Sequence, residues 1–180
     1  MKLKIEDLLS LEDYDDQREV IKKDLISHKK NRTVSIGEHV ILLFEDYSTI
    51  KYKVQEMLRI EKIFEAELIQ DELDTYNPLI PDGNNLKATM LIEYTDILER
   101  KEKLQKLKGV EKNIWIKIGN SEPVYPIADE DLEREDETKT SAVHFLRWEF
   151  DKNQIKDFKE GSPVSIGVNH REYESSCILH

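Results

Sequence analysis

The 180-residue chain carries 38 acidic and 27 basic residues, which gives a formal net charge of −11. This acidic balance argues against nucleic-acid binding, which needs a concentrated basic face, and against binding to an anionic membrane surface. The single cysteine, Cys177, excludes an intramolecular disulfide and a multi-cysteine metal site. A chain of this length can bury the core of one domain, so we expect a single globular domain over residues 1–180.

Two features of the sequence favour a cytoplasmic protein. The N-terminal segment turns acidic at Glu6-Asp7, before the apolar part of a signal peptide could develop. The longest apolar run, residues 40–44, is too short to span a bilayer. We therefore expect a cytoplasmic protein that binds neither membrane nor nucleic acid.

The first half of the chain predicts a helix, two short strands and a second helix. Ser10 is expected to cap a helix over about 10–30, because apolar side chains then recur at steps of three and four residues. Short strands are expected at 34–36 and 40–44. A second helix starts at Asp46 or Ser48 and continues, or bends near Lys62, until Asn77-Pro78 ends it.

The middle of the chain predicts a loop, a strand and a third helix. Residues 77–85 read as a loop with a tight turn at Asp82-Gly83, followed by a strand over 87–94. A helix follows over about 96–108 and ends at Gly109. The side chains that we expect to point inward from this helix are Ile97, Lys101, Leu104 and Leu107.

The second half predicts mostly strands. Alternating isoleucines indicate a strand over 114–118 that turns toward Val124-Tyr125, and an acidic segment, 129–137, precedes a strand over 142–150. A short helix over 152–159 leads to a last strand over 164–168, and the tail over about 171–180 is expected to be frayed. The pattern predicts an α+β fold with one mostly antiparallel or mixed sheet of about five to seven strands and three or four helices.

No standard catalytic motif occurs in the sequence. It contains no phosphate-binding glycine loop, no Gly-x-Ser-x-Gly elbow and no His-Glu-x-x-His pair. The sequence therefore assigns no catalytic residue and no particular cofactor.

The strand over 144–150 offers the first candidate site. Strand alternation puts His144 on an apolar face and Arg147 and Glu149 on the opposite face. His144 could bind a metal, or it could be a core histidine that bonds to backbone atoms. Arg147 and Glu149 could hold an anionic ligand, or they could form ion pairs with a neighbouring strand.

Other ionisable residues give weaker candidates. A soft metal such as zinc could be bound by a C-terminal set that matches no standard spacing: His170, Glu172, Tyr173, Cys177 and His180. Glu61, near the apolar face of the second helix, and Glu93, at a strand end, could carry protons or ligate a metal if buried, or could pair with an arginine. The candidates are thus Glu61, Glu93 and Arg147 for a cofactor and His144, Glu149 and His170 for a metal.

Four long strings carry a family resemblance that covers about residues 32–170. They are Glu56-Met57-Leu58-Arg59-Ile60-Glu61-Lys62-Ile63-Phe64, Tyr76-Asn77-Pro78-Leu79-Ile80-Pro81-Asp82-Gly83, Ile127-Ala128-Asp129-Glu130-Asp131-Leu132-Glu133-Arg134-Glu135 and Ser141-Ala142-Val143-His144-Phe145-Leu146-Arg147-Trp148-Glu149. With them the chain resembles a bacterial family known as domain of unknown function 3501. One departure is His170-Arg171, where the family tends to have His-Pro; it puts a tight turn there, and a shared role for His170, in doubt.

The resemblance implies a context and no reaction, because the family has no assigned activity. Its genes often lie beside those for rubrerythrin-like and iron–sulfur oxidoreductase proteins. This neighbourhood implies an accessory role in redox or peroxide-stress metabolism.

Two hypotheses follow. In the first, the chain is a non-catalytic accessory protein that docks on a redox partner through an exposed patch around residues 76–85 and 129–137. In the second, it is a small metal- or cofactor-dependent enzyme that gathers several of these residues in one site: Glu61, Glu93, His144, Arg147, Glu149 and His170. The sequence names neither a substrate nor an oligomeric state.

Overall fold

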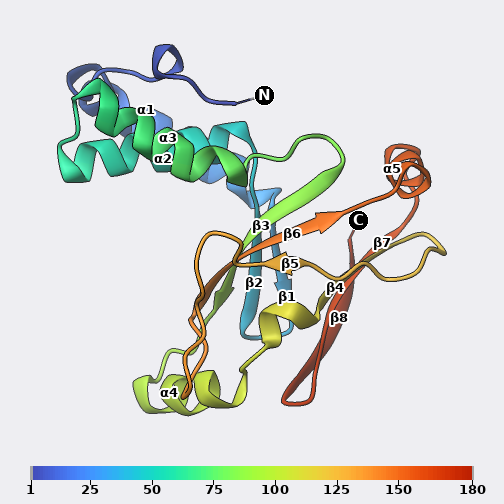
Figure 1. The fold of residues 1–180 in the computed structure, drawn as a ribbon. Helices are drawn as coiled ribbons and strands as arrows, with labels where there is room; N and C mark the ends of the chain where they lie inside the picture. Colours follow the sequence, from blue (N-terminus) through green and yellow to red (C-terminus); the bar gives the residue numbers. More distant parts are fainter. Residues whose placement is uncertain (1, 180) are drawn as a thin grey trace. The chain divides into compact units, whose positions relative to one another are not determined.

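The computed structural model describes residues 2–179 and confirms the α+β prediction (Figure 1). Within these residues the chain forms five α-helices and two antiparallel sheets, where the sequence predicted three or four helices and one sheet. The expected single domain is built of two compact units. Unit 1 comprises the residues up to 33 and 45–82, and unit 2 comprises 34–44 and the residues from 83 onward.

Unit 1 is helical, with α1 (Leu11–Lys30), α2 (Tyr47–Glu61), α3 (Ala66–Tyr76) and two short 3-10 turns, η1 (Ile5–Asp7) and η2 (Asn77–Leu79). Figure 1 shows the three helices side by side. As expected, Ser10 caps α1 by accepting a hydrogen bond from the Asp13 N–H, and Asp46 caps α2 by accepting one from the Thr49 N–H. These caps satisfy donors that have no partner within a helix.

The predicted bend near Lys62 is a break between two helices. Lys62 has a φ of 54°, in the left-handed region, and its N–H bonds to carbonyls of the last turn of α2. The two helices that this break separates pack on a common apolar core. The buried side chains of this core are Leu3, Ile50, Val54, Leu58, Leu73 and Ile80.

The five-stranded sheet has the order β1-β2-β3-β6-β5. Its strands are β1 (Thr33–Ile36), β2 (Val40–Phe44), β3 (Asn85–Ile92), β6 (Val143–Glu149) and β5 (Ile127–Ala128). The predicted strand at Val124-Tyr125 is reduced to a single bridge between Val124 and Ile116, and pairing with β6 starts only at Ile127.

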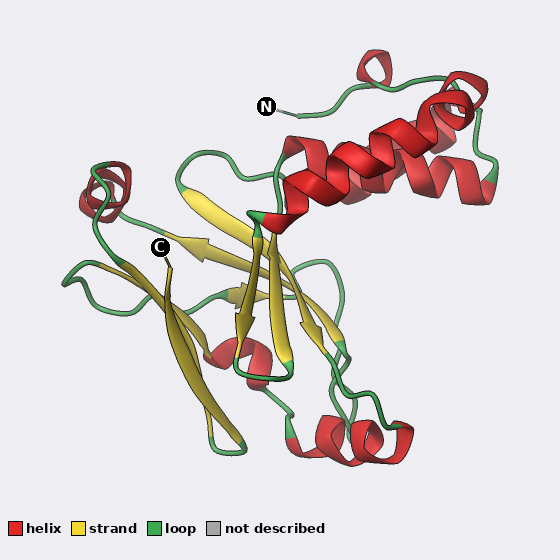
Figure 2. Cartoon of the chain, turned by 180° about the vertical axis from the view of Figure 1, so that it is seen from behind, coloured by secondary structure: helices red, strands yellow, loops and turns green. Residues whose placement is uncertain are grey.

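The second sheet has three strands in the order β4-β7-β8, whereas the sequence predicted only one sheet. It consists of β4 (Ile114–Ile118), β7 (Val164–His170) and β8 (Tyr173–Leu179), and Figure 2 shows the β7–β8 hairpin from behind. The predicted frayed tail is wrong for residues 173–179, because β8 pairs with β7 along its whole length. His170 pairs with Tyr173, so Arg171 and Glu172 make a tight turn without the proline.

Two further helices complete unit 2: α4 (Ile97–Lys106) and α5 (Lys152–Lys159). The predicted inward face of α4 is half wrong. Leu104 and Leu107 are buried, but Ile97 is 69% exposed and Lys101 is exposed as well. Only the C-terminal end of this helix reaches the core of unit 2, so its first turn remains in solvent.

Both sheets of unit 2 contribute to one apolar core. Trp148 of β6 is fully buried, and its indole N–H donates to the carbonyl oxygen of Ile114 at the start of β4, 3.0 Å away. This bond satisfies the one polar atom of the largest core side chain. Within residues 2–179, no helix has both the length and the apolar character needed to cross a membrane.

Candidate functional site

The strand β6 carries three of the candidate residues and divides them between two faces, as predicted. His144, Leu146 and Trp148 are buried, whereas Arg147 and Glu149 alternate with them and face the other side. His144 and Glu149 therefore do not share a site, although both were metal candidates.

His144 is fully buried and bonded at both ring nitrogens. Nδ1 lies 2.5 Å from Oδ2 of Asp129, and Nε2 lies 3.0 Å from the Thr140 hydroxyl and from the Ser141 carbonyl oxygen. Burial of an imidazole is costly unless its polar atoms have partners, and these oxygens supply them. A metal ion could bind His144 only by displacing one of them.

Asp129 holds this network to the strand. Its φ of 52° lies in the left-handed region, which aspartate tolerates better than most residues. Its other carboxylate oxygen, Oδ1, accepts from the Phe145 N–H at 2.9 Å and from Arg134 at 3.2 Å. One carboxylate thereby joins the side chain of His144, the backbone of β6 and the acidic segment.

The rest of the acidic segment is ordered by charge. The Arg134 guanidinium donates to both oxygens of Asp131, at 2.5 and 2.7 Å, and lies 4.5 Å from the ring centroid of Phe145. Arg134 holds the pKa of the Asp131 carboxyl below its ordinary value. Hydrogen bonds from Thr138 and from the Lys139 N–H lower the pKa of Asp136 to about 2. This segment, expected to be a docking patch, is thus tied together by its own side chains.

Arg147 and Glu149 form the ion-pair arrangement that the sequence left open. Arg147 donates to both oxygens of Glu130, which follows β5, at 2.7 and 2.6 Å, and it also contacts Glu149. The Asn85 amide of β3 donates to the same Glu149 at 2.8 Å. Arg147 lowers the pKa of Glu130, and the acidic partners raise that of Arg147. These bonds link β6 to both neighbouring strands, as bidentate arginine–carboxylate pairs do well.

The remaining candidates lie elsewhere. His170, at the end of β7, donates from Nε2 to the Lys108 carbonyl oxygen at 2.9 Å and accepts the Glu172 N–H at Nδ1. Glu93 is exposed beyond β3, and Glu61 is exposed at the last position of α2, in unit 1. Among residues 2–179, no three His, Cys, Asp or Glu side chains are grouped so that they could hold a metal ion.

The C-terminal metal set is dispersed along a hairpin. Cys177 is half-buried, lies 3.9 Å from the Ser35 carbonyl oxygen, and has a pKa that burial raises. Tyr173 donates its hydroxyl to the Ile36 carbonyl oxygen at 2.6 Å. His180 lies outside the described residues.

Glu111 is a buried carboxylate that sequence reasoning missed. It lies in the 3-10 turn η3 (Val110–Asn113), and only 3% of the residue is exposed. Its Oε1 lies 3.7 Å from Nζ of Lys112, and its Oε2 has no hydrogen-bond partner among residues 2–179. A glutamate in a charged turn carries no pattern that would have predicted its burial.

Unit 1 contains a groove between α1 and α2 with a volume of about 680 Å³. Tyr14 and Gln55 lie at its inner wall and are already bonded, to Glu56 at 2.8 Å and to the Leu9 N–H at 2.7 Å. The groove is lined by Leu9, Tyr14, Gln17, Ile21, Asp24, Leu25, His28, Tyr47, Ser48, Lys51, Tyr52 and Gln55.

A second groove of unit 1, of about 270 Å³, is almost entirely apolar. We call it the end groove; it is lined by Ile5, Leu8, Leu9, Ser10, Leu11, Leu58, Ile63, Phe64 and Ile69. Phe64 is 71% exposed, and Ile60 and Leu68, four residues before and after it in the sequence, are 63% and 47% exposed. No other stretch of unit 1 leaves three large apolar side chains this exposed within nine residues of the described chain.

Comparisons with known proteins find similar proteins, but none of them has an assigned reaction. A crystal structure of a protein of unknown function from Burkholderia pseudomallei K96243 is similar to this chain, with 48% sequence identity and a TM-score of 0.95, covering 100% of this chain and 94% of that one. No curated protein matches the chain. The family model described as "Protein of unknown function (DUF3501)" matches residues 2–180. The chain therefore belongs to the DUF3501 family.

Proposed function

We propose that this chain is a non-catalytic accessory protein that binds a partner protein. The observation that carries the proposal is the exposure of Phe64 at the apolar end groove, together with the exposure of Ile60 and Leu68, four residues before and after it in the sequence. Clustered apolar side chains on a surface typically mark an interaction site. The ionisable residues of β6, by contrast, bond to one another and to the adjoining strands.

The docking site that we propose differs from the one expected from sequence. In the 76–85 region, Tyr76 is half-buried and Ile80 is 7% exposed, so this loop offers little apolar surface. In the 129–137 segment, Leu132 is exposed, but the charged side chains around it are engaged in ion pairs. The residues of the end groove are the better candidates.

We further propose that the partner is a cytoplasmic redox protein, of the rubrerythrin-like or iron–sulfur oxidoreductase kind. The support is the gene neighbourhood that the family resemblance implies, together with the single half-buried cysteine, which suits a reducing compartment. In this proposal the chain has no role in binding nucleic acid or membrane.

Sedimentation velocity tests the proposal directly. The purified chain is mixed at about 10 µM with a purified rubrerythrin-like protein or iron–sulfur oxidoreductase from the same genome, a concentration that reports Kd values of typical transient complexes. We expect a faster-sedimenting species with one of them. If neither forms a complex at this concentration, the redox-partner proposal is wrong.

One observation favours the alternative, a metal- or cofactor-dependent enzyme. The unpartnered oxygen of buried Glu111 is costly, and such groups in native proteins call for an explanation such as a ligand. Elemental analysis and a visible spectrum of natively purified protein separate the two proposals. Stoichiometric metal or a bound chromophore that Glu111→Gln removes would support the enzyme, and a Glu111→Gln variant with unchanged content would count against it.

A further inference from the structure

The end groove is built by three elements of unit 1. Leu8 and Leu11 come from the entry to α1, Leu58 from the end of α2, and Ile63 and Phe64 from the turn before α3. Its floor is part of the buried core, since Leu58 is 2% exposed, whereas its rim residue Phe64 is 71% exposed. The groove therefore has a floor that is part of the packed core and a rim residue, Phe64, that is open to solvent.

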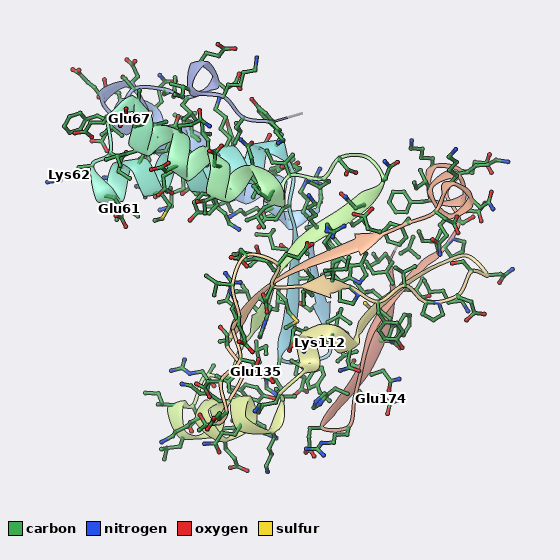
Figure 3. All side chains as sticks on the ribbon, in the orientation of Figure 1. Glu61, Lys62, Glu67, Lys112, Glu135 and Glu174 are labelled. Carbon is green, nitrogen blue, oxygen red and sulfur yellow. The ribbon has the colours of Figure 1, made fainter. Side chains whose placement is uncertain are left out.

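Exposed acidic residues lie within two positions of the lining residues in sequence; we call Glu12, Glu61, Glu65 and Glu67 the acidic rim. Residues 61–76 contain six acidic residues and one basic residue, Lys62, and residues 6–19 contain seven acidic residues and one basic residue, Arg18. Figure 3 shows Glu61, Lys62 and Glu67 at the same end of the helical unit. Two nearby cations are already paired, Arg59 with Asp15 at 2.7 Å and Lys4 with Glu6 at 3.2 Å.

Charge is separated along α1. Its N-terminal part, next to the end groove, carries the acidic residues, whereas residues 20–32 contain five basic residues and one acidic residue. The separation matches the helix dipole at both ends. It also concentrates negative potential where the apolar side chains are exposed, and such a field attracts a partner of opposite charge.

We propose that the end groove binds a cationic amphipathic helix of a partner protein, whose apolar face covers Phe64 and the apolar floor of the groove and whose lysines or arginines meet the acidic rim. The proposal rests on the accessory function proposed above and names the chemistry of the partner surface. An amphipathic helix lays a stripe of apolar residues into a groove and keeps its charged residues at the edges.

The charge of the rim decides between occupants. A second copy of this chain would bring its own acidic rim against the first, and like charges placed opposite each other disfavour a contact. Phosphate-bearing partners such as nucleic acid or an anionic membrane are repelled for the same reason. A basic protein segment gains from both the apolar strip and the acidic rim.

The test uses three synthetic 18-residue peptides and the full chain. One peptide has leucine at helical spacing with lysine between, the second replaces every lysine with glutamate, and the third scrambles the first. Binding is followed by ¹⁵N chemical-shift titration at low salt. We expect the first peptide alone to bind, with shifts concentrated at residues 5–11 and 58–69, and with affinity that falls as salt is added.

Variants of the chain localise the effect. Phe64→Ser removes the exposed aromatic anchor and is expected to weaken binding roughly tenfold, as loss of a hot-spot residue does. Glu65→Lys with Glu67→Lys is expected to weaken it roughly three- to tenfold at low salt. The matched controls are Leu98→Ser, at a residue 78% exposed on α4, and Glu174→Lys, on β8 (Figure 3), which should change affinity less than twofold.

Several outcomes overturn the proposal. These are equal binding by Phe64→Ser and wild type, equal binding of the lysine and glutamate peptides, shifts that map to the groove between α1 and α2, or a dimer of the chain that Phe64→Ser dissociates. Failure here is distinguishable from failure of the accessory function. If a redox partner binds wild type and Phe64→Ser equally, the accessory function is supported but the end groove is not its binding site. If the lysine peptide binds but no redox partner does, the end groove is a binding site but the redox-partner proposal is wrong.

Discussion

Asp129 is the position at which a structural role for His144 is most easily tested. Asp129→Ala removes the acceptor of His144 Nδ1, at 2.5 Å, and of the Phe145 N–H, at 2.9 Å. A buried donor left without an acceptor costs about 1–3 kcal/mol. Alanine in the left-handed backbone, at a φ of 52°, adds about 1–2 kcal/mol. Arg134 keeps its hydrogen bonds to Asp131 in this variant, so we count no further loss of stability for Arg134. With both donors counted, the expected loss in the free energy of unfolding is about 3–8 kcal/mol.

Urea denaturation followed by tryptophan fluorescence measures this loss. Asp129→Asn keeps the left-handed preference and one acceptor oxygen, so we expect it to cost about half as much. Glu133→Ala, an exposed change in the same segment, is the control and should stay within about 0.5 kcal/mol of wild type. A loss below about 1 kcal/mol for Asp129→Ala would refute the structural role, because it would mean that His144 does not depend on this carboxylate.

Three further predictions follow from contacts in the two units. Gly167→Ala would place a Cβ 2.5 Å from the Trp115 ring and 2.8 Å from the Ser175 carbonyl oxygen, so we expect it to lower the free energy of unfolding by about 1–3 kcal/mol. In thermal melts, Trp115→Leu in the same chain should reverse only the part of this loss that comes from the ring. Glu56→Gln breaks a carboxylate–arginine pair at 2.7 Å between side chains that are 16% and 22% exposed, and urea denaturation at pH 7 should show a loss of about 1–2 kcal/mol; no loss would mean the pair is dispensable. Because Arg18 lowers the pKa of Glu56 below its ordinary value of 4.5, this stabilisation is complete above that pH and is lost as the pH falls through the lowered pKa, so the gap between wild type and Glu56→Gln should close in acid and remain constant from pH 6 to 8.

The elements of the fold that could be predicted are those with local signals. Ser10 and Asp46 were recognisable as caps, and the alternation in β6 placed His144 and Trp148 inside and Arg147 outside. These features depend on residues close in sequence, which is why a single chain is enough to read them.

The second sheet was missed because its last strand has a weak pattern. In β8, four half-buried residues alternate with exposed ones: Tyr173, Ser175, Cys177 and Leu179. Two of the four, Ser175 and Cys177, are small, so they do not stand out in the sequence as buried positions. The alternation was present in the sequence, but because these residues lie at the end of the chain, a frayed tail was predicted instead of a strand. The pairing of β8 with β7 depends on tertiary contacts such as the bond from Tyr173 to Ile36, 137 residues away.

The candidate functional residues also differ in how well the sequence could predict their surroundings. An acidic partner for Arg147 could be expected, but Glu130 lies 17 residues away, just after β5, and it comes within reach of Arg147 only because β5 pairs with β6. The exposure of Phe64 could not be predicted from the sequence, because phenylalanine is among the residues that are most often buried. The surface on which the proposed function depends is therefore one that composition and periodicity do not mark.

Isothermal titration of the chain with a purified redox partner tests the central claim most directly. We predict a complex with a micromolar Kd and at least a roughly tenfold loss of affinity for Phe64→Ser, with the affinity of Leu98→Ser unchanged. Absence of binding up to about 100 µM, a limit that still detects weak transient complexes, would contradict it.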